Sequence, residues 1–212
     1  ARIADEVRTL RAWGYDLIKH DFTTDDLTGR WGFEMDTRVG DSARPADPGR
    51  TTAEILKDLY ATIREAAGDA ILIGCNTVGH LTAGTHEVSR TGDDTSGREW
   101  SRTVKMGPNT LAMRMAQHGT FHAADADCVA FTGRVPEALD LRWLDLVSRS
   151  GTPLFVSASP EGLTPKVRKA LRAAYARAAV PRDPSVPLDW RETVAPRRWR
   201  HHDGEAAYDW SE

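Results

Sequence analysis

The stretch Leu17–Asp26, LIKHDFTTDD, places a lysine and three carboxylates directly behind a short apolar run. The segment from Tyr15 to Phe22 has the composition of a buried strand, and Lys19 and Asp21, two positions apart on it, project from the same face. Charges at the end of a buried strand are costly unless they are paired or used. The stretch therefore predicts a solvated turn, a metal site or the working end of an enzyme.

Four further segments have a similar composition. Most are continuous apolar runs rather than alternating ones, which is typical of strands buried on both faces in a parallel sheet. They are Ala70–Thr77 (AILIGCNT), a weaker one around His86–Arg90, Asp127–Phe131 (DCVAF) and Pro153–Ser157 (PLFVS).

Helical signals fall between these strands. Thr51 and Glu54 have the spacing of a capping box, and Thr164 precedes Pro165 as an N-cap precedes a first-turn proline. Further helices are expected at the start of the chain, over residues 108–119 and after Pro136. Repeated strand–helix units predict an α/β fold, either a barrel or a doubly wound sheet. Because no glycine-rich phosphate loop follows a strand, nucleotide binding is the weaker option.

The bulk composition narrows the function classes. The chain has 212 residues, 40% hydrophobic and 28% charged, with a net charge of −3, which predicts one large soluble domain with a small appendage. This balance gives no electrostatic case for a nucleic-acid or membrane partner, and the basic run RRWRHH at 197–202 is typical of a solvated surface. Cys75 and Cys128 form no CxxC pair, so a secreted and a cytoplasmic location both stay open.

The two ends of the sequence also carry information. The chain starts without Met inside a helical pattern of Ile3, Val7 and Leu10, which suggests a processed or truncated chain. Beyond Val180 the segment PRDPSVP reads as a linker. The residues after it have strand-like aromatics and an Asp-Gly turn at 203–204, and predict the first strands of a separate β domain.

Chemistry in parallel α/β folds gathers beyond the carboxyl ends of the strands. Asp21 follows the first strand, and Asp93 and Asp94 follow the third, in SRTGDD. Two carboxylates delivered by different strands to one rim are what glycoside cleavage requires. Lys19 favours the ionised form of Asp21, and Lys19 and Arg90 are suitable donors to sugar hydroxyls. Spacing alone leaves a purely structural role for these residues equally open.

Two rival chemistries also remain open on the residues alone. His80, His86, Asp93 and Asp125 are candidate metal ligands, although no HExxH pattern or CxxC pair supports them. Cys75 is a candidate nucleophile, although a buried strand cysteine is more often inert.

At these residues the sequence resembles the α-galactosidase-like retaining glycoside hydrolases, the clan of families twenty-seven and thirty-six. DLIKHDF is similar to the family's fourth barrel strand, in which a lysine precedes the nucleophilic aspartate by two positions; these are Lys19 and Asp21. GCNT resembles the end of the fifth strand, where the residue after a cysteine contacts the sugar, here Asn76. SRTGDD resembles the sixth-strand pattern of a sugar-binding arginine and an acid/base aspartate, here Arg90 and Asp94. DADCVAF and PLFVSAS resemble strands seven and eight.

This resemblance implies a fold and a reaction. Residues 1–180 are expected to form the second part of a (β/α)8 TIM barrel, strands four to eight, and residues 181–212 a linker and the start of a C-terminal β-sandwich. The implied activity is that of a retaining α-glycosidase, α-galactosidase-like, with Asp21 as nucleophile, Asp94 as acid/base, and no cofactor or metal. The implied substrate-binding residues are Lys19, Asn76, Arg90, Asp93 and Trp31, the last as an apolar wall.

Three departures from the family pattern keep alternatives open. Asn76 stands where common α-galactosidases have another residue, so the sugar is open, and Asp93 beside Asp94 leaves the acid/base open by one position. The family's first three strands do not precede Leu17, and a partial barrel exposes sheet edges. The expected partners are therefore a glycoside or oligosaccharide and the missing barrel strands, from the same or another chain. A transglycosidase, another α-glycoside specificity, or a carbohydrate-binding module that lost activity are the alternatives.

Overall fold

The computed structural model describes residues 2–23 and 46–212, which fall into two compact units. The N-terminal unit spans Ala1–Arg90 and the C-terminal unit spans Thr91–Glu212. Within the described ranges, no helix is long and apolar enough to cross a membrane.

The N-terminal unit contains a parallel sheet. β1 pairs with β2 in parallel, with Lys19 opposite Ile73, and β2 pairs with β3 in parallel, with Gly74 opposite Ser89. The described elements of this unit are, in order, α1 (Arg2–Ala12), β1 (Leu17–His20), α3 (Thr52–Ala67), β2 (Ile71–Gly74), the short 3₁₀ turn η1 (Gly79–Leu81) and β3 (Val88–Arg90). The strands therefore lie where the apolar runs predicted them.

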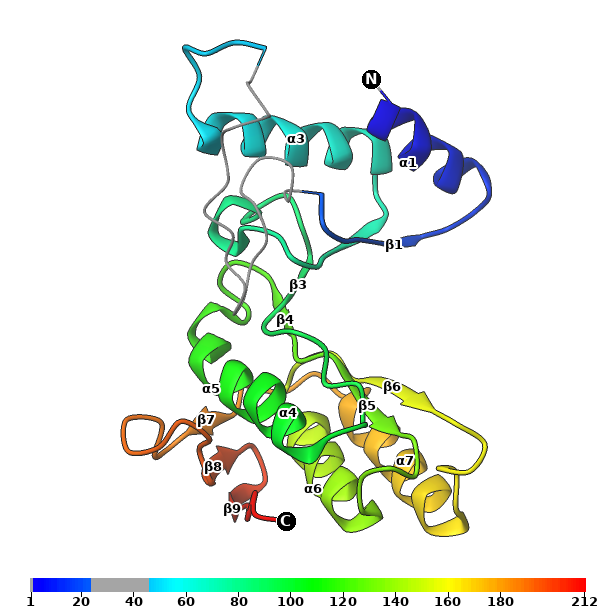
Figure 1. The fold of residues 1–212 in the computed structure, drawn as a ribbon, viewed down its shortest axis with the longest axis vertical. Coiled ribbons are helices and arrows are strands. Elements are labelled where there is room, and N and C mark those ends of the chain that lie inside the picture. Colours follow the sequence, from blue (N-terminus) through cyan, green and yellow to red (C-terminus); the bar gives the residue numbers. More distant parts are fainter. Residues whose placement is uncertain (1, 24–45) are drawn as a thin grey trace. The chain divides into compact units, whose positions relative to one another are not determined.

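Helix α3 begins where the capping box predicted. The Thr51 hydroxyl accepts from the Glu54 backbone N–H, and the Glu54 carboxylate accepts from the Thr51 N–H at 2.7 Å. Val7 of α1, Ile63 of α3 and Leu72 of β2 are buried together, so both helices bury an apolar stripe in one core with the sheet. Helices α1 and α3 lie next to one another (Figure 1). This core holds β1 and β2 in place and so fixes where their carboxyl ends lie.

The C-terminal unit contains a second parallel pair, β5 with β6, in which Val129 lies opposite Val156. Helices α6 and α7 bury Leu139, Trp143 and Val167 in the same core as Val129, and lie side by side (Figure 1). The elements up to this point are α4 (Trp100–Val104), the π-helical turn η2 (Lys105–Asn109), α5 (Thr110–Arg114), the 3₁₀ turn η3 (Met115–Gln117), β4 (Ala123–Asp125), β5 (Cys128–Phe131), α6 (Glu137–Arg149), β6 (Phe155–Ala158) and α7 (Pro165–Ala178).

An antiparallel sheet ends the chain. Its strands are β7 (Val186–Pro187), β8 (Arg198–His201) and β9 (Gly204–Ala207), in the order β7–β8–β9. Along β8 the burial alternates, so that Trp199 and His201 point inward and the arginines outward. Trp199, Tyr208 and Trp210 belong to the core that α6 shares, so this sheet is packed into the C-terminal unit.

The helix expected over residues 108–119 differs from the prediction. The helical path begins at Trp100, and Pro108 lies inside the π-helical turn rather than at a helix start. A proline has no N–H to donate, and the wider π turn relieves the clash that its ring causes in an α-helix. A Cβ on Gly107 of this turn would lie 2.8 Å from the Trp143 ring, so the glycine allows η2 to approach α6 closely.

Strand–helix alternation and parallel pairing confirm the α/β class. The assignment to strands four to eight of a barrel, the β-sandwich, and the domain boundary at residue 180 stay predictions.

Candidate active site

The carboxyl ends of β1, β2 and β3 bring predicted site residues together in the N-terminal unit. His20, Gly74 and Ser89 share one level of the parallel sheet. The next residue of each strand is Asp21, Cys75 and Arg90, and the Cys75 N–H continues the ladder by donating to the His20 carbonyl at 3.0 Å. The register therefore places a carboxylate, a thiol and a guanidinium side by side.

Asp21 accepts two hydrogen bonds in this group. The Asn76 side-chain amide donates to Asp21 Oδ1 at 2.7 Å, and the Phe22 N–H donates to the same oxygen at 2.8 Å. Phe22 and Asn76 both have positive φ, 54° and 49°. Non-glycine residues rarely adopt this conformation, and such residues cluster at functional sites. The backbone after β1 and after β2 therefore turns sharply where the Asp21–Asn76 contact is made.

The pKa of Cys75 is affected by three neighbouring charged groups. Burial raises the pKa of its thiol to about 11, while the positive charges of Arg90 and Lys19 lower it and Asp21 raises it. Lys19, Asp21 and Arg90 are thus all within electrostatic reach of one thiol. A thiol with a raised pKa is a poor nucleophile at neutral pH. This environment favours a structural role for Cys75 over a nucleophilic one.

A histidine pair lies on the opposite face of β1, because His20 alternates with Lys19 and Asp21. His20 Nε2 lies 2.6 Å from His86 Nε2, and the ring of the fully buried Tyr60 packs edge-on against His86. One of the two nitrogens donates and the other accepts, so the rings hold complementary tautomers. Burial lowers the pKa of His20 to about 4, although the charge of Asp21 raises it. Burial therefore favours the neutral form of His20, and the His20–His86 contact ties β1 to the segment that precedes β3.

The other two predicted carboxylates lie in the C-terminal unit, in the loop after β3. Asp93 forms an ion pair with Arg102 of α4 at 2.6 Å, and the Arg102 Nε donates to the Asp94 carbonyl at 2.9 Å. The Asp94 N–H donates to Asp93 Oδ1 at 2.8 Å. Asp93 therefore holds the loop through its ion pair with Arg102, and the Asp94 residue beside it is exposed.

Asp127 holds the same loop through hydrogen bonds to Thr95. Its Oδ2 accepts from the Thr95 N–H at 2.7 Å, and the Thr95 hydroxyl lies 3.0 Å from that oxygen. Both residues are buried, Thr95 with 1% of its surface exposed and Asp127 with 8%. The Asp127 N–H in turn donates to Asp125 Oδ1 at 2.8 Å. This chain of bonds links β4 and the start of β5 to the segment next to Asp94.

Asp127→Ala is expected to lower the free energy of unfolding by about 2–4 kcal/mol, because it removes a charge-assisted hydrogen bond and leaves the buried Thr95 N–H without its acceptor. Asp127→Asn is the matched variant: its amide oxygen can still accept, and asparagine tolerates the positive φ of 67° found there. Urea unfolding of both variants gives the comparison. Equal stability of the alanine variant and the unaltered protein would contradict the role assigned to Asp127.

The predicted residues thus form two groups. Lys19, Asp21, Asn76 and Arg90 are brought together in the N-terminal unit, and Asp93 and Asp94 are neighbours in the C-terminal unit. Trp31 lies outside the described residues. The separation of Asp21 from Asp94 stays a prediction.

Sequence reasoning missed three contributors: the His20–His86 pair, Arg102 and the Asp127–Thr95 bond. His20 had a signal as the residue between Lys19 and Asp21, and His86 was considered only as a metal ligand. Across residues 2–23 and 46–212, no group of three or more His, Cys, Asp or Glu side chains has an arrangement that could hold a metal ion.

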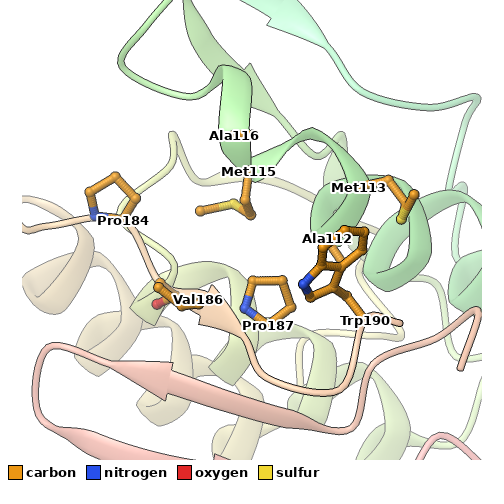
Figure 2. Close-up of a pocket in the computed structure, with 9 residues that line it drawn as sticks. Ala112, Met113, Met115, Ala116, Pro184, Val186, Pro187 and Trp190 are labelled. Atoms are coloured by element: carbon orange, nitrogen blue, oxygen red, sulfur yellow. The ribbon is translucent and has the colours of Figure 1, made fainter. Parts of the chain in front are cut away.

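An apolar pocket of about 320 Å³ lies elsewhere in the C-terminal unit, between α5–η3 and β7 (Figure 2). Met115, Val186 and Trp190 are among the side chains that line it, and no predicted site residue does. None of its lining side chains is titratable, so the pocket offers apolar contacts but no acid, base or nucleophile.

Comparison with solved structures identifies the fold. An α-galactosidase from Thermus thermophilus, in complex with p-nitrophenyl α-D-galactopyranoside, is 24% identical, with a TM-score of 0.60 over 97% of this chain and 40% of that chain. The same enzyme in complex with stachyose matches with a TM-score of 0.55, at 24% identity, over 81% of this chain and 36% of that chain. A family twenty-seven β-L-arabinopyranosidase from Geobacillus stearothermophilus is 14% identical, with a TM-score of 0.57 over 82% of this chain and 40% of that chain.

These matches concern the fold and part of the length. No protein-family model matches the sequence, and a search of the curated proteins finds no match. The chain spans 36% to 40% of the length of these solved glycosidases. It therefore has the fold of part of an α-galactosidase-type glycoside hydrolase chain, which the strand-end motifs predicted.

Proposed function

We propose that the protein is a retaining α-glycoside hydrolase of the α-galactosidase type. The observation that carries the proposal is the Asp21 carboxylate, which follows β1, accepts from Asn76 at 2.7 Å, and shares its surroundings with Lys19 and Arg90. A carboxylate that accepts from an amide and lies beside two cations, at the carboxyl ends of parallel strands, suits an attacking nucleophile. The two Thermus thermophilus complexes, which hold an aryl α-galactoside and stachyose, support the same substrate class.

The proposed reaction has two displacements. Asp21 attacks the anomeric carbon and forms a glycosyl ester, while Asp94 gives its proton to the departing glycosidic oxygen. Asp94 then takes a proton from water, whose oxygen attacks the anomeric carbon and releases the Asp21 carboxylate. Two inversions give net retention, and this geometry requires the two carboxyl groups to lie about 5–5.5 Å apart.

The remaining predicted residues bind the sugar or hold the site around it in this proposal. Lys19, Asn76 and Arg90 hold sugar hydroxyls beside the nucleophile, Asp93 orients the Asp94 loop through Arg102, and Trp31 contributes an apolar wall. The reaction requires no cofactor.

The proposal also includes the strands that precede β1 in the related barrels. Within the described N-terminal unit β1 pairs only with β2, and Leu17 on it is 47% exposed. An open strand edge with apolar side chains is a site for further pairing. We place the missing barrel strands, from the same or another chain, at this edge.

The stereochemistry of the product tests the reaction. With p-nitrophenyl α-D-galactopyranoside and the full-length protein, the first sugar seen by proton NMR is expected to be the α anomer, which then mutarotates. A first-formed β anomer would indicate a single inverting displacement and would contradict the glycosyl-aspartate mechanism.

A panel of substrates separates the alternatives. Aryl α-galactoside, α-glucoside and β-L-arabinopyranoside compared side by side give the sugar specificity, and transfer to an added sugar acceptor marks a transglycosidase. Saturable binding of galactose without turnover of any of these glycosides would instead favour the carbohydrate-binding module.

A further inference from the structure

A second pocket lies at the carboxyl ends of β5 and β6, entirely within the C-terminal unit. Its volume is about 330 Å³, at the lower end of the range for small-molecule sites. Phe131 at the end of β5, the first turn of α6 and the loop before α7 form its walls. The lining residues are Phe131, Gly133, Arg134, Val135, Pro136, Glu137, Asp140, Glu161, Gly162 and Thr164.

Asp140 is the unusual member of this lining. Only 3% of its surface is exposed, and the described residues of the structure provide its carboxylate with no hydrogen bond and no ion pair. Buried carboxylates are normally paired, because an isolated buried charge is costly. Asp140 thus lines a pocket with acceptor oxygens that no protein donor uses.

The other charged groups around the pocket either have partners or are exposed to solvent. Glu137 accepts from the Thr164 hydroxyl at 2.6 Å and pairs with Lys166 of α7 at 3.1 Å. Glu161 and Arg134 are exposed. Three carboxylates against one lining guanidinium and the Lys166 ammonium leave the surroundings slightly negative, and the deepest charge is Asp140.

Glu137 and Asp140 lie three residues apart in the first turn of α6, and therefore face the same side of the helix. A ligand that enters the pocket therefore meets the unpaired Asp140 carboxylate, with the Glu137 carboxylate, which Thr164 and Lys166 already contact, beside it. A primary ammonium group carries three N–H donors and a full positive charge, which match an unpaired carboxylate in a slightly negative pocket. An anion would be repelled, and a divalent metal ion needs more oxygen ligands than these two side chains offer.

We propose that this pocket binds a compact organic cation through a primary ammonium group held by the Asp140 carboxylate. Phe131, Val135 and Pro136 supply the apolar wall for the body of the ligand. Neither Asp21 nor Asp94 lines this pocket, and the proposal does not depend on the glycosidase function.

The affinity of the pocket for a cation is expected to depend on pH. Burial raises the pKa of Asp140 to about 7, so a proton competes with the cation just below neutrality. Glu137, Glu161, Arg134 and Lys166 are the other charged groups at the pocket. If only the ionised Asp140 binds the cation, the dissociation constant is expected to be about 30-fold higher at about pH 5.5 than at about pH 8.

Cyclohexylamine, which is protonated at both pH values, and cyclohexanol, which has nearly the same shape and no charge, are the probes. Isothermal titration of the full-length protein is expected to show binding of cyclohexylammonium and at least ten-fold weaker binding of cyclohexanol, since a neutral hydroxyl has one donor and no charge. Equal binding of the two, or no cyclohexylammonium binding at millimolar concentration, overturns the proposal.

Two variants complete the test. Asp140→Asn is expected to weaken cyclohexylammonium binding at least ten-fold and to remove its pH dependence, whereas Glu161→Gln, at an exposed lining carboxylate, should change it less than three-fold, as a surface charge does. An unchanged affinity in Asp140→Asn refutes the assignment. Titration of the unaltered protein in two buffers of different ionisation enthalpy provides a second measurement that does not rely on a variant: binding near neutrality must release a proton, and binding without release refutes the assignment as well.

Discussion

Asp21→Asn in the full-length protein is expected to lower kcat for an aryl α-galactoside by about three orders of magnitude or more, because the amide cannot form the glycosyl ester that divides the reaction into two steps. The Asn76 contact should survive the change, since the amide oxygen of the new side chain accepts as the carboxylate does at 2.7 Å. The loss should therefore appear in kcat, with KM within a few-fold of the original.

Asp16→Asn is the matched control for this variant. Asp16 precedes β1, is exposed, and pairs with Arg11 on the surface, so its charge should have little effect on turnover. A turnover number for Asp21→Asn within ten-fold of the unaltered enzyme would remove Asp21 as nucleophile.

Chemical rescue gives a sharper readout of the same site. In Asp21→Gly the space of the nucleophile is vacant, and added azide can attack the anomeric carbon from that face while the aryl oxide leaves. One displacement inverts the centre, so the expected product is the β-galactosyl azide. Recovery of the α-glycosyl azide, or no rescue at any azide concentration, would argue against Asp21 facing the anomeric carbon.

Asp140→Asn is expected to stabilise the protein at alkaline pH and to have no such effect in acid. Burial raises the pKa of the folded-state carboxyl from 3.8 to about 7. A raised carboxyl pKa means that the folded state holds a proton that the unfolded state has already lost. Below about pH 4 both states are protonated and the group costs nothing; between about pH 4 and 7 the cost grows, and above pH 7 it is complete.

The full difference is about 2–4 kcal/mol, with the favourable position of Asp140 at the start of α6 reducing it. Urea unfolding at about pH 4 and about pH 8, followed by tryptophan fluorescence, measures the effect. Trp100, Trp143, Trp199 and Trp210 are all buried in the C-terminal unit and report on it. Asp183→Asn, at an exposed carboxylate of the same unit, is the control. A stability difference that is the same at both pH values would show that Asp140 is solvated or paired in solution.

Local signals in the sequence were sufficient for much of this fold. The capping box at Thr51 and the proline after Thr164 mark helix starts through contacts within one turn, and both helices begin there. The continuous apolar runs at 70–77 and 127–131 contain β2 and β5, because a strand buried on both faces needs apolar residues at every position. The grouping of Lys19, Asp21 and Asn76 followed from parallel strands ending at one edge.

The features that were missed depend on contacts between segments far apart in the chain. Pro108 reads locally as a helix start, and only the surrounding helical path from Trp100 shows it inside a π turn. Asp140 lies beside Leu139 and reads as a solvated position on an amphipathic helix. Its burial depends on the pocket walls that residues 161–164 add from another part of the sequence. The hydrophobic pattern of a single helix cannot predict a contact with a distant segment of the chain.

The left-handed backbone at Asn76 limits how the proposed sugar site can change by mutation. With φ at 49°, valine, isoleucine and threonine are excluded there by their branched Cβ, while asparagine, aspartate and glycine are tolerated. Substitution at this position is therefore confined to a few residues that differ in charge and length. Asparagine donates to Asp21, aspartate would repel it, and glycine has no side chain to contact it. Divergence of specificity through position 76 should occur in abrupt steps, and a mutant library built for new sugars gains most by sampling those three residues.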